Sequence, residues 1–280
     1  MKVALSALSA LAVAAALACA PAPAALAASP DFSWSDALSA GKTIWINGLN
    51  GHIAAARAPG RTASVTAVKT GKPSQLDRVH IVATPSADGI TICALYPRKH
   101  GGETECVPEH GVRGDDIDDV DVDVDFTVQV PEGVKLEART VNGGIDATDL
   151  ASDAEAATVN GTIHLSTSGI AEAHTVNGSI TASMGRSTWD HALRFETVNG
   201  SVRLTLPHEV NAELHANSLN GSISSDFPVT LNGEFWHKGG SVGGTIGKGG
   251  SPLRLSTVNG SIVIARVGGA DGSDSKKSRL

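Results

Sequence analysis

The stretch Thr-Val-Asn-Gly-Thr-Ile at residues 158–163 is one copy of a hexapeptide that recurs along this 280-residue chain and decides its fold. Clear copies begin at Thr140, Thr158, Thr175, Thr197, Ser218 and Thr257. A degenerate copy, Ser-Val-Gly-Gly-Thr-Ile, lies at 241–246, and an outlying relative, Gly-Leu-Asn-Gly-His-Ile, lies at 48–53. Successive asparagines from the first clear copy onward, with Gly243 taking the slot in the degenerate copy, are 16 to 23 residues apart. A period near 20 residues is typical of a solenoid.

The residues between the copies alternate in polarity, as in Val-Arg-Leu-Thr-Leu at 202–206, which indicates short strands. We expect each Asn-Gly to form a tight corner, because Asn and Gly tolerate positive φ better than other residues. Stacked asparagine amides would bond along the ladder. The Val before each corner and the Ile after it would both point inward. The structural corner residues are Asn142, Gly143, Asn160, Gly161, Asn177, Gly178, Asn199, Gly200, Asn220, Gly221, Asn259 and Gly260.

The fold class is therefore all-β. Asn-Gly is also the favoured two-residue hairpin turn, so an antiparallel β-sandwich or barrel built from Asn-Gly hairpins is the alternative. The recurring period near 20 residues favours a β-helix-like β-solenoid, in which copies of one motif stack in register. We expect about seven coils between Thr140 and Ile264.

The chain divides into four segments. Residues 1–27 are typical of a signal peptide, with Lys2, an apolar run and Ala25-Leu26-Ala27 as a cleavage site. A lipoprotein anchored at Cys19 is the alternative. Residues 28–134 are expected to form an irregular β N-terminal segment, 135–266 the repeat solenoid and 267–280 a disordered tail. No later stretch approaches 18 apolar residues, so a membrane span is not expected.

Composition narrows the classes of partner. The formal net charge is −7 and aromatic residues make up only 4% of the chain. An acidic chain does not favour a phosphate backbone, and few aromatic rings are available for base stacking, so no nucleic-acid partner is expected. We expect no cofactor.

Cys93 and Cys106 are the two cysteines that remain after the signal segment. An even pair in an exported protein indicates a disulfide. It would close a loop of about 14 residues and contribute on the order of 3 kcal/mol by chain entropy.

Seven aspartates lie within residues 115–125. From Asp119 onward they alternate with valine, which places Asp119, Asp121, Asp123 and Asp125 on a wet strand face. We interpret this run as a strand edge that its charge protects from further pairing. Calcium binding by these four aspartates is the alternative, because carboxylate oxygens suit Ca²⁺, and a Ca-dependent structural module would follow from it.

Catalytic motifs are not evident. The carboxylates of the repeat region look scattered, without a shared slot, and Pro-His-Glu-Val-Asn at 207–211 is not the zinc motif His-Glu-x-x-His. A carbohydrate-active enzyme on a β-helix is the alternative that paired carboxylates would favour. We expect the protein not to be an enzyme.

The stretch 122–134, which ends in Val-Pro-Glu-Gly-Val, runs into the first Thr-Val-Asn-Gly. This pattern resembles the bacterial putative-adhesin family, a β-strand-repeat domain of unknown function with repeated Val-Asn-Gly-x-Ile coils, over roughly residues 40–265. The resemblance implies an exported or envelope-associated all-β protein and transfers no catalytic residue.

These features favour a non-catalytic exported protein of the cell envelope or surface, acting as an adhesin or scaffold. Its location would be the periplasm or the cell surface. A cell-envelope component or a polysaccharide would be its partner, bound by outward Thr, Ser, His and Arg side chains between the corners. Open solenoid ends would allow self-association.

Overall fold

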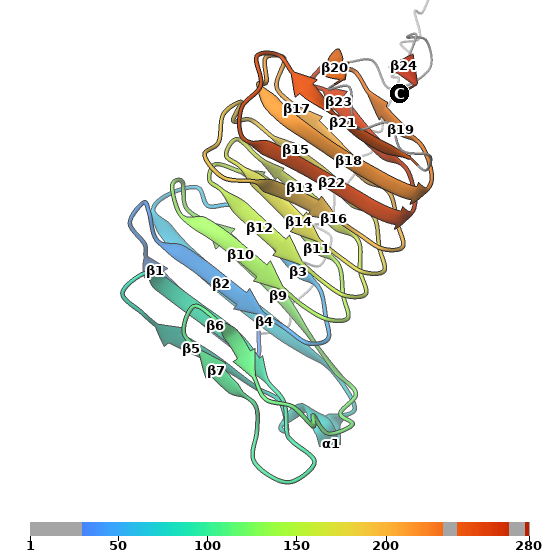
Figure 1. Ribbon diagram of the computed structural model, residues 1–280. Helices are drawn as coiled ribbons and strands as arrows, with labels where there is room; N and C mark the ends of the chain where they lie inside the picture. The colour runs from blue at the N-terminus through green and yellow to red at the C-terminus, as the bar shows by residue number, and fades with distance from the viewer. Residues whose placement is uncertain (1–29, 232–239, 269–277, 280) are drawn as a thin grey trace, which may run out of the picture.

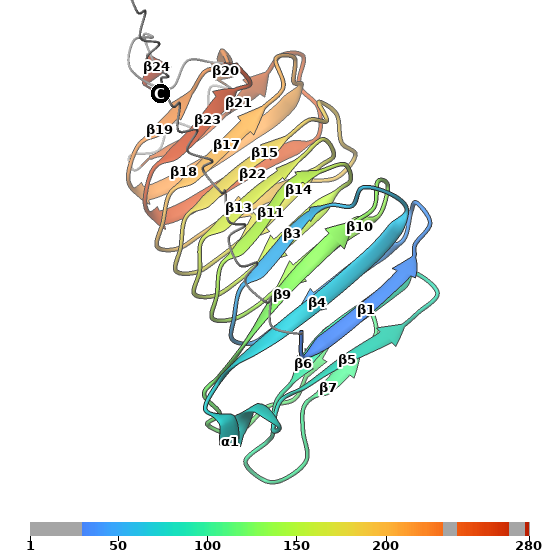
Figure 2. The same cartoon turned by 180° about the vertical axis from the view of Figure 1, so that it is seen from behind.

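The computed structural model describes residues 30–231, 240–268 and 278–279. The expected signal segment 1–27 with Cys19, and most of the expected tail, lie outside the described residues. The described chain forms two long β-sheets that pack face to face along one axis (Figures 1 and 2).

Sheet A and sheet B each contain eleven strands. In spatial order, sheet A contains β1 (Phe32–Ala37), β4 (Thr62–Gly71), β9 (Val122–Val130), β3 (Ile53–Arg57), β11 (Ile145–Leu150), β13 (Ile163–Thr167), β15 (Ile180–Met184), β17 (Val202–Leu206), β23 (Ile262–Arg266), β19 (Ile223–Ser225) and β24 (Ser278–Arg279). Sheet B contains β20 (Val229–Leu231), β21 (Ser241–Ile246), β18 (Ala212–Asn220), β22 (Pro252–Asn259), β16 (Leu193–Glu196), β14 (Ala171–His174), β12 (Ala154–Ala157), β10 (Lys135–Arg139), β2 (Thr43–Asn47), β6 (Gly89–Leu95) and β5 (His80–Pro85). A small hairpin, β7 (Glu105–Val107) with β8 (Gly111–Arg113), and a short helix, α1 (Pro73–Leu76), complete the described fold.

The β-solenoid is confirmed. Each Asn-Gly joins a strand of sheet B to a strand of sheet A, as between β12 and β13, and neighbouring coils run parallel in both sheets. The hairpin-built sandwich or barrel is wrong, because a hairpin would place the two strands that flank Asn-Gly next to each other in one antiparallel sheet. Equivalent residues stack directly: Ile145 pairs with Ile163, and Ile163 with Ile180.

The stacking order of the coils is not the order of the chain. Strand β22 lies between β16 and β18, and β23 lies between β17 and β19. Asn259 therefore lies between Asn199 and Asn220 in the ladder, although it comes after both in the chain.

The degenerate copy at 241–246 is not a corner. It forms β21, which runs antiparallel to β18 on the side away from β22. Its side chains are largely buried, and a Cβ on Gly244 would collide with β20. The copy has no asparagine to enter the amide ladder, so it continues sheet B instead of turning into sheet A.

The outlying copy near the N-terminus is a true corner. Strands β2 and β3 flank it, and they lie between the β6/β9 strands and the β10/β11 coil. Asn50 is bridged to Asn142, so part of the segment 28–134, expected to be irregular, takes a regular place in the ladder. The boundary between residues 134 and 135 stays a prediction.

The aspartate run ends in an interior strand. Strand β9 pairs with β4 on one side and with β3 on the other, so its interpretation as an exposed strand edge is wrong. Alternation does hold, because Val120, Val122 and Val124 are buried while the intervening aspartates are exposed. The charges therefore cover the outer face of a paired strand rather than blocking its edge.

The corner glycines are needed for close approach. A Cβ on Gly161 would come within 3.0 Å of the carbonyl oxygen of Gly143, and one on Gly178 would meet Gly161 in the same way. Neither glycine has a positive φ, and among the described residues none of the corner asparagines does. The expectation that positive φ selects Asn-Gly is therefore wrong at these corners.

The two residues before each Asn have opposite roles. The Thr is buried and its hydroxyl donates to a glycine carbonyl of a neighbouring coil, as from Thr175 Oγ1 to Gly161 O at 3.0 Å. The Val is exposed: Val176 retains 39% of its accessible surface, whereas Ile180 is fully buried. The expectation that this Val points inward is wrong, because the threonine fills the inner position and the asparagine must reach the ladder.

Candidate binding face

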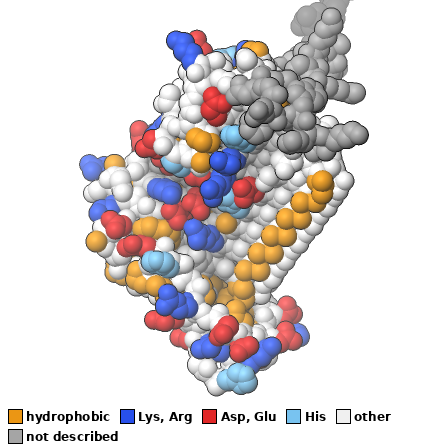
Figure 3. Space-filling model, in the orientation of Figure 1, with side chains coloured by type: hydrophobic (Ala, Val, Ile, Leu, Met, Phe, Trp, Pro, Cys, Tyr) orange, Lys and Arg blue, Asp and Glu red, His pale blue; other side chains and the backbone are white. Residues whose placement is uncertain are grey.

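The outer surface of sheet B and the edge beside it are the most distinctive surfaces of the described chain. Figure 3 shows charged side chains gathered over sheet B and a diagonal apolar row along its edge. The row consists of the exposed residues Val159, Val176, Val198, Val258 and Leu219, here called the valine ridge. The asparagine ladder runs next to it, with amide-to-amide bonds of 2.7 to 2.9 Å.

Three glutamates share one slot on sheet B. Glu137 is opposite Glu155, and Glu155 is opposite Glu172, on the outer face of β10, β12 and β14. The expectation that carboxylates of the repeat region have no shared slot is wrong. Each of these glutamates lies three residues before the Thr of a Thr-Val-Asn-Gly copy, so a constant offset from the repeat was the signal that sequence reasoning missed.

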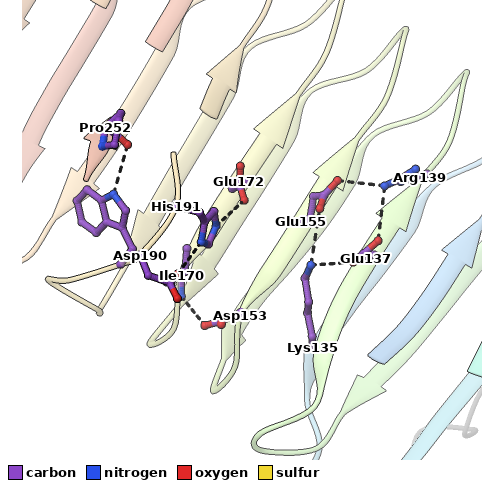
Figure 4. Close-up of polar contacts among 11 residues, drawn as sticks. Lys135, Glu137, Arg139, Asp153, Glu155, Ile170, Glu172, Asp190, His191 and Pro252 are labelled. Atoms are coloured by element: carbon purple, nitrogen blue, oxygen red, sulfur yellow. Dashed lines mark hydrogen bonds and ion pairs between the residues drawn. The ribbon is translucent and has the colours of Figure 1, made fainter. Parts of the chain in front are cut away.

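Lys135, Arg139 and Trp45 contact this carboxylate column, and Figure 4 shows Lys135 and Arg139 beside Glu137 and Glu155. Lys135 Nζ donates to Glu137 Oε1 at 2.7 Å, and Trp45 Nε1 donates to Glu137 Oε2 at 3.0 Å. Arg139 bridges Glu137 and Glu155 at 3.5 and 3.2 Å. Burial lowers the pKa of Lys135, but the hydrogen bond to Glu137 and the charges of Glu137, Glu155 and Glu172 outweigh it, so the pKa of Lys135 is raised. The acidic column is thus locally neutralised.

His191, in the loop before β16, contacts the third glutamate of the column, Glu172. Its Nε2 lies 3.2 Å from Glu172 Oε1 and its Nδ1 lies 2.9 Å from Asp190 Oδ1. The hydrogen bond to Asp190 raises the pKa of His191 against the opposing effect of burial, and Glu172 adds to the rise. The same hydrogen bond lowers the pKa of Asp190.

Two shallow depressions lie toward the β18 end of sheet B. One, of about 300 Å³, is lined by residues that include Glu196, His215, Asn217, Arg254 and Ser256. The other, of about 440 Å³, shares Glu196, Asn217 and Ser256 and reaches the valine ridge at Val198, Val258 and Leu219. Together they place hydrogen-bonding groups beside exposed apolar side chains.

The aspartate run does not gather into a metal centre. In the described parts of the chain there is no group of three or more His, Cys, Asp or Glu side chains placed to hold a metal ion. Asp125 accepts a hydrogen bond from the backbone N–H of His52 at 2.7 Å. Asp118, just before the alternating stretch, is paired with Arg78 at 2.6 Å, and that hydrogen bond lowers its pKa.

The two cysteines lie at the other end of sheet B. A disulfide joins Cys93 of β6 to Cys106 of β7, with a Cα–Cα distance of 5.8 Å. Cys93 is fully buried, so the disulfide links the small β7/β8 hairpin covalently to the interior of sheet B.

Comparison with known proteins places the chain in a family. Residues 117–265, more than half of the sequence, match the family described as Toastrack DUF4097. The chain belongs to this family. Toastrack is a family of unknown function, and its β-solenoid-like fold agrees with the stacked coils. No curated protein matches the chain.

Three solved structures are similar to this Toastrack chain at low identity. A putative cell adhesion protein from Clostridium sporogenes has 9% identity and a TM-score of 0.42, covering 85% of this chain and 100% of that one. A putative adhesin from Bacteroides fragilis has 9% identity and a TM-score of 0.24, with coverage of 84% and 96%. A putative adhesin from Parabacteroides merdae has 10% identity and a TM-score of 0.23, with coverage of 83% and 95%.

Among the described residues, no helix has the length and apolar character that crossing a bilayer requires.

Proposed function

We propose that this protein is a non-catalytic, exported β-repeat protein of the cell envelope or cell surface that acts as an adhesin or scaffold. The observation that carries the proposal is that, within each coil, one set of residues stacks the coils and a different set faces outward. Thr, Asn, Gly and Ile of the repeat are used for stacking, while the residues that vary from coil to coil lie on the outer faces of the sheets. A rigid ladder with variable outer columns is suited to binding an extended partner.

Export is supported by two further features. Residues 1–27 have the composition of a signal peptide. The Cys93–Cys106 disulfide is of the kind that persists in oxidising compartments. Cell fractionation locates the protein, and the mass of the exported form tests cleavage after Ala27. Recovery in the cytoplasm with an intact N-terminus would contradict export, and a lipid-modified Cys19 would establish the lipoprotein alternative.

Sedimentation tests the binding role. The purified protein is mixed with isolated cell envelopes and with a panel of insoluble polysaccharides, and its depletion from the supernatant is measured. We expect saturable depletion by at least one of these surfaces. Absence of depletion from all of them would contradict the adhesin role.

A carbohydrate-active enzyme is the second candidate, because three carboxylates share one column. Adjacent strands lie about 4.8 Å apart, close to the carboxyl spacing of retaining glycosidases, roughly 5–5.5 Å. The ion pairs of Lys135, Arg139 and His191 with these carboxylates favour a structural role instead. Release of reducing ends from a polysaccharide by wild type, and its loss in Glu155→Gln, would establish the enzyme.

A further inference from the structure

The outward column of sheet B changes sign along the solenoid. Beyond the glutamates, Arg194 of β16 is opposite Arg254 of β22, and Arg254 is opposite His215 of β18. Both arginines are exposed. Arg194 and Arg254 are neighbours only because β22 is inserted between β16 and β18. The insertion brings together residues that are 60 positions apart in the chain.

The two halves of the column differ in how their charges are compensated. The like-charged glutamates are bridged by Lys135 and Arg139. Within the described residues neither Arg194 nor Arg254 has an ion pair, although the chain as a whole is acidic. The nearby carboxylates are engaged elsewhere: Glu172 contacts His191 at 3.2 Å and Glu196 contacts His174 at 3.5 Å. Like charges directly opposite each other in a sheet are destabilising, so an anion that bridges the two guanidinium groups would remove a cost.

The surroundings of the arginine pair restrict the anion. Arg254 lines the 300 Å³ depression together with Asn217 and Ser256, which offer amide and hydroxyl groups. The adjoining depression adds apolar surface from Val198 and Leu219. A sugar ring presents hydroxyls at its rim and C–H groups on its faces, which matches this mixture. A guanidinium group binds a carboxylate through two parallel hydrogen bonds.

We propose that Arg194 and Arg254 bind the carboxylate groups of an acidic polysaccharide laid along the β16–β22–β18 end of sheet B. This inference rests on the proposed binding role and names the substrate class of that face. An anionic membrane is the less favoured partner, because Glu172 and Glu196 lie on the same face and a broad negative surface would be repelled by them. A single chain laid from Arg194 toward β18 runs away from Glu172, which occupies the same column on β14.

The test is binding to immobilised polygalacturonate, with its methyl ester as the uncharged comparator, across a range of NaCl concentrations. We expect wild type to bind the acid form and not the ester, with affinity that falls as salt rises. Replacing both arginines, in Arg194→Gln/Arg254→Gln, should weaken binding about tenfold or more. Arg203→Gln is the matched control, because Arg203 is an exposed arginine on the outer face of sheet A. Its binding should stay at the wild-type level.

Four results would overturn the inference. Equal loss in the Arg203→Gln control would show general charge attraction rather than a site. Binding of the wild type to phosphatidylglycerol vesicles but not to polygalacturonate would assign the arginines to a membrane. If the double variant still sediments with cell envelopes as wild type does, the arginine site is contradicted but the proposed function is not. If wild type binds neither envelopes nor any glycan, both the arginine site and the proposed function are contradicted. Thermal denaturation of each variant establishes that the fold is retained.

Discussion

The side-chain amide of Asn177 donates to Oδ1 of Asn160 at 2.8 Å, and the amide of Asn199 donates to Asn177 with the same geometry. Asn177 therefore takes part in two rungs of the ladder, whereas Asn220 takes part in one, as a donor to Asn259 at 2.9 Å. At about 1 kcal/mol per bond, Asn177→Ala should lower the free energy of unfolding by about 2 kcal/mol and Asn220→Ala by about 1 kcal/mol. Urea denaturation measures both, and equal losses would contradict the ladder.

The close approach of corner glycines makes a second prediction. Gly178→Ala should destabilise the protein by about 1–3 kcal/mol, because the new Cβ collides with the backbone of the coil beside it. Gly60→Ala is the control, since a Cβ there meets nothing within 4 Å and the residue has no positive φ. If the two variants unfold at the same urea concentration, the close approach does not exist in solution.

The inward and outward positions beside a corner can be separated by mutation. Ile180→Ala removes a fully buried side chain and should cost about 2–5 kcal/mol. Val176→Ala truncates an exposed member of the valine ridge and should change stability by less than about 0.5 kcal/mol. A larger loss at Val176 would show that the ridge is buried, for example by self-association, and sedimentation velocity would then test for a dimer.

The disulfide should stabilise the β6–β7 connection. Cys93→Ala/Cys106→Ala is expected to lower the free energy of unfolding by about 3 kcal/mol, mainly because the unfolded chain gains freedom. Reducing agent should destabilise wild type by a similar amount and leave the double variant unaffected. A response of the double variant to reducing agent would assign the effect to another cause.

His191 should make stability depend on pH. Its pKa in the folded chain is raised above its usual value by Asp190, against the effect of burial, with Glu172 adding to the rise. The stabilisation is therefore fully present below the unfolded-state pKa of about 6.5 and is lost as pH rises through the folded-state pKa. His191→Gln should lower the melting temperature more at about pH 5.5 than at about pH 8.5. An equal decrease at both values would show that His191 does not bind these carboxylates as a cation.

Sequence alone predicted the solenoid, the asparagine ladder and the inward Ile, because each follows from the period and from side-chain alternation. It did not predict that Val176 is exposed, because the hexapeptide does not show which of Thr and Val occupies the inner position. Nor did the repeat predict the place of β22 and β23. Every copy carries the same stacking residues. The local sequence therefore sets the register in which a coil pairs, but it does not determine which coils lie on either side of it.

Only part of the candidate binding face could be predicted from the sequence. The glutamate column could have been found by aligning residues three positions before each Thr-Val-Asn-Gly, which gives Glu137, Glu155 and Glu172. The same alignment gives Arg194 and Arg254, but the intervening copy at Ser218 would place His215 between them. Only the inserted coil makes the two arginines neighbours.

The proposed arginine site on sheet B depends on the interleaved order of the coils. A cross-link between two coils tests that order most directly. The backbone N–H of Val258 donates to Val198 O at 3.3 Å, so these two residues are on adjacent coils, while Leu219 is one coil further. Adjacent strands lie about 4.8 Å apart, within the range that a disulfide spans, and alternate strands lie too far apart. Oxidised Val198→Cys/Val258→Cys should yield the linked peptide by mass spectrometry, and Val198→Cys/Leu219→Cys should not. The opposite pattern would mean that the coils stack in chain order and that Arg194 and Arg254 do not meet.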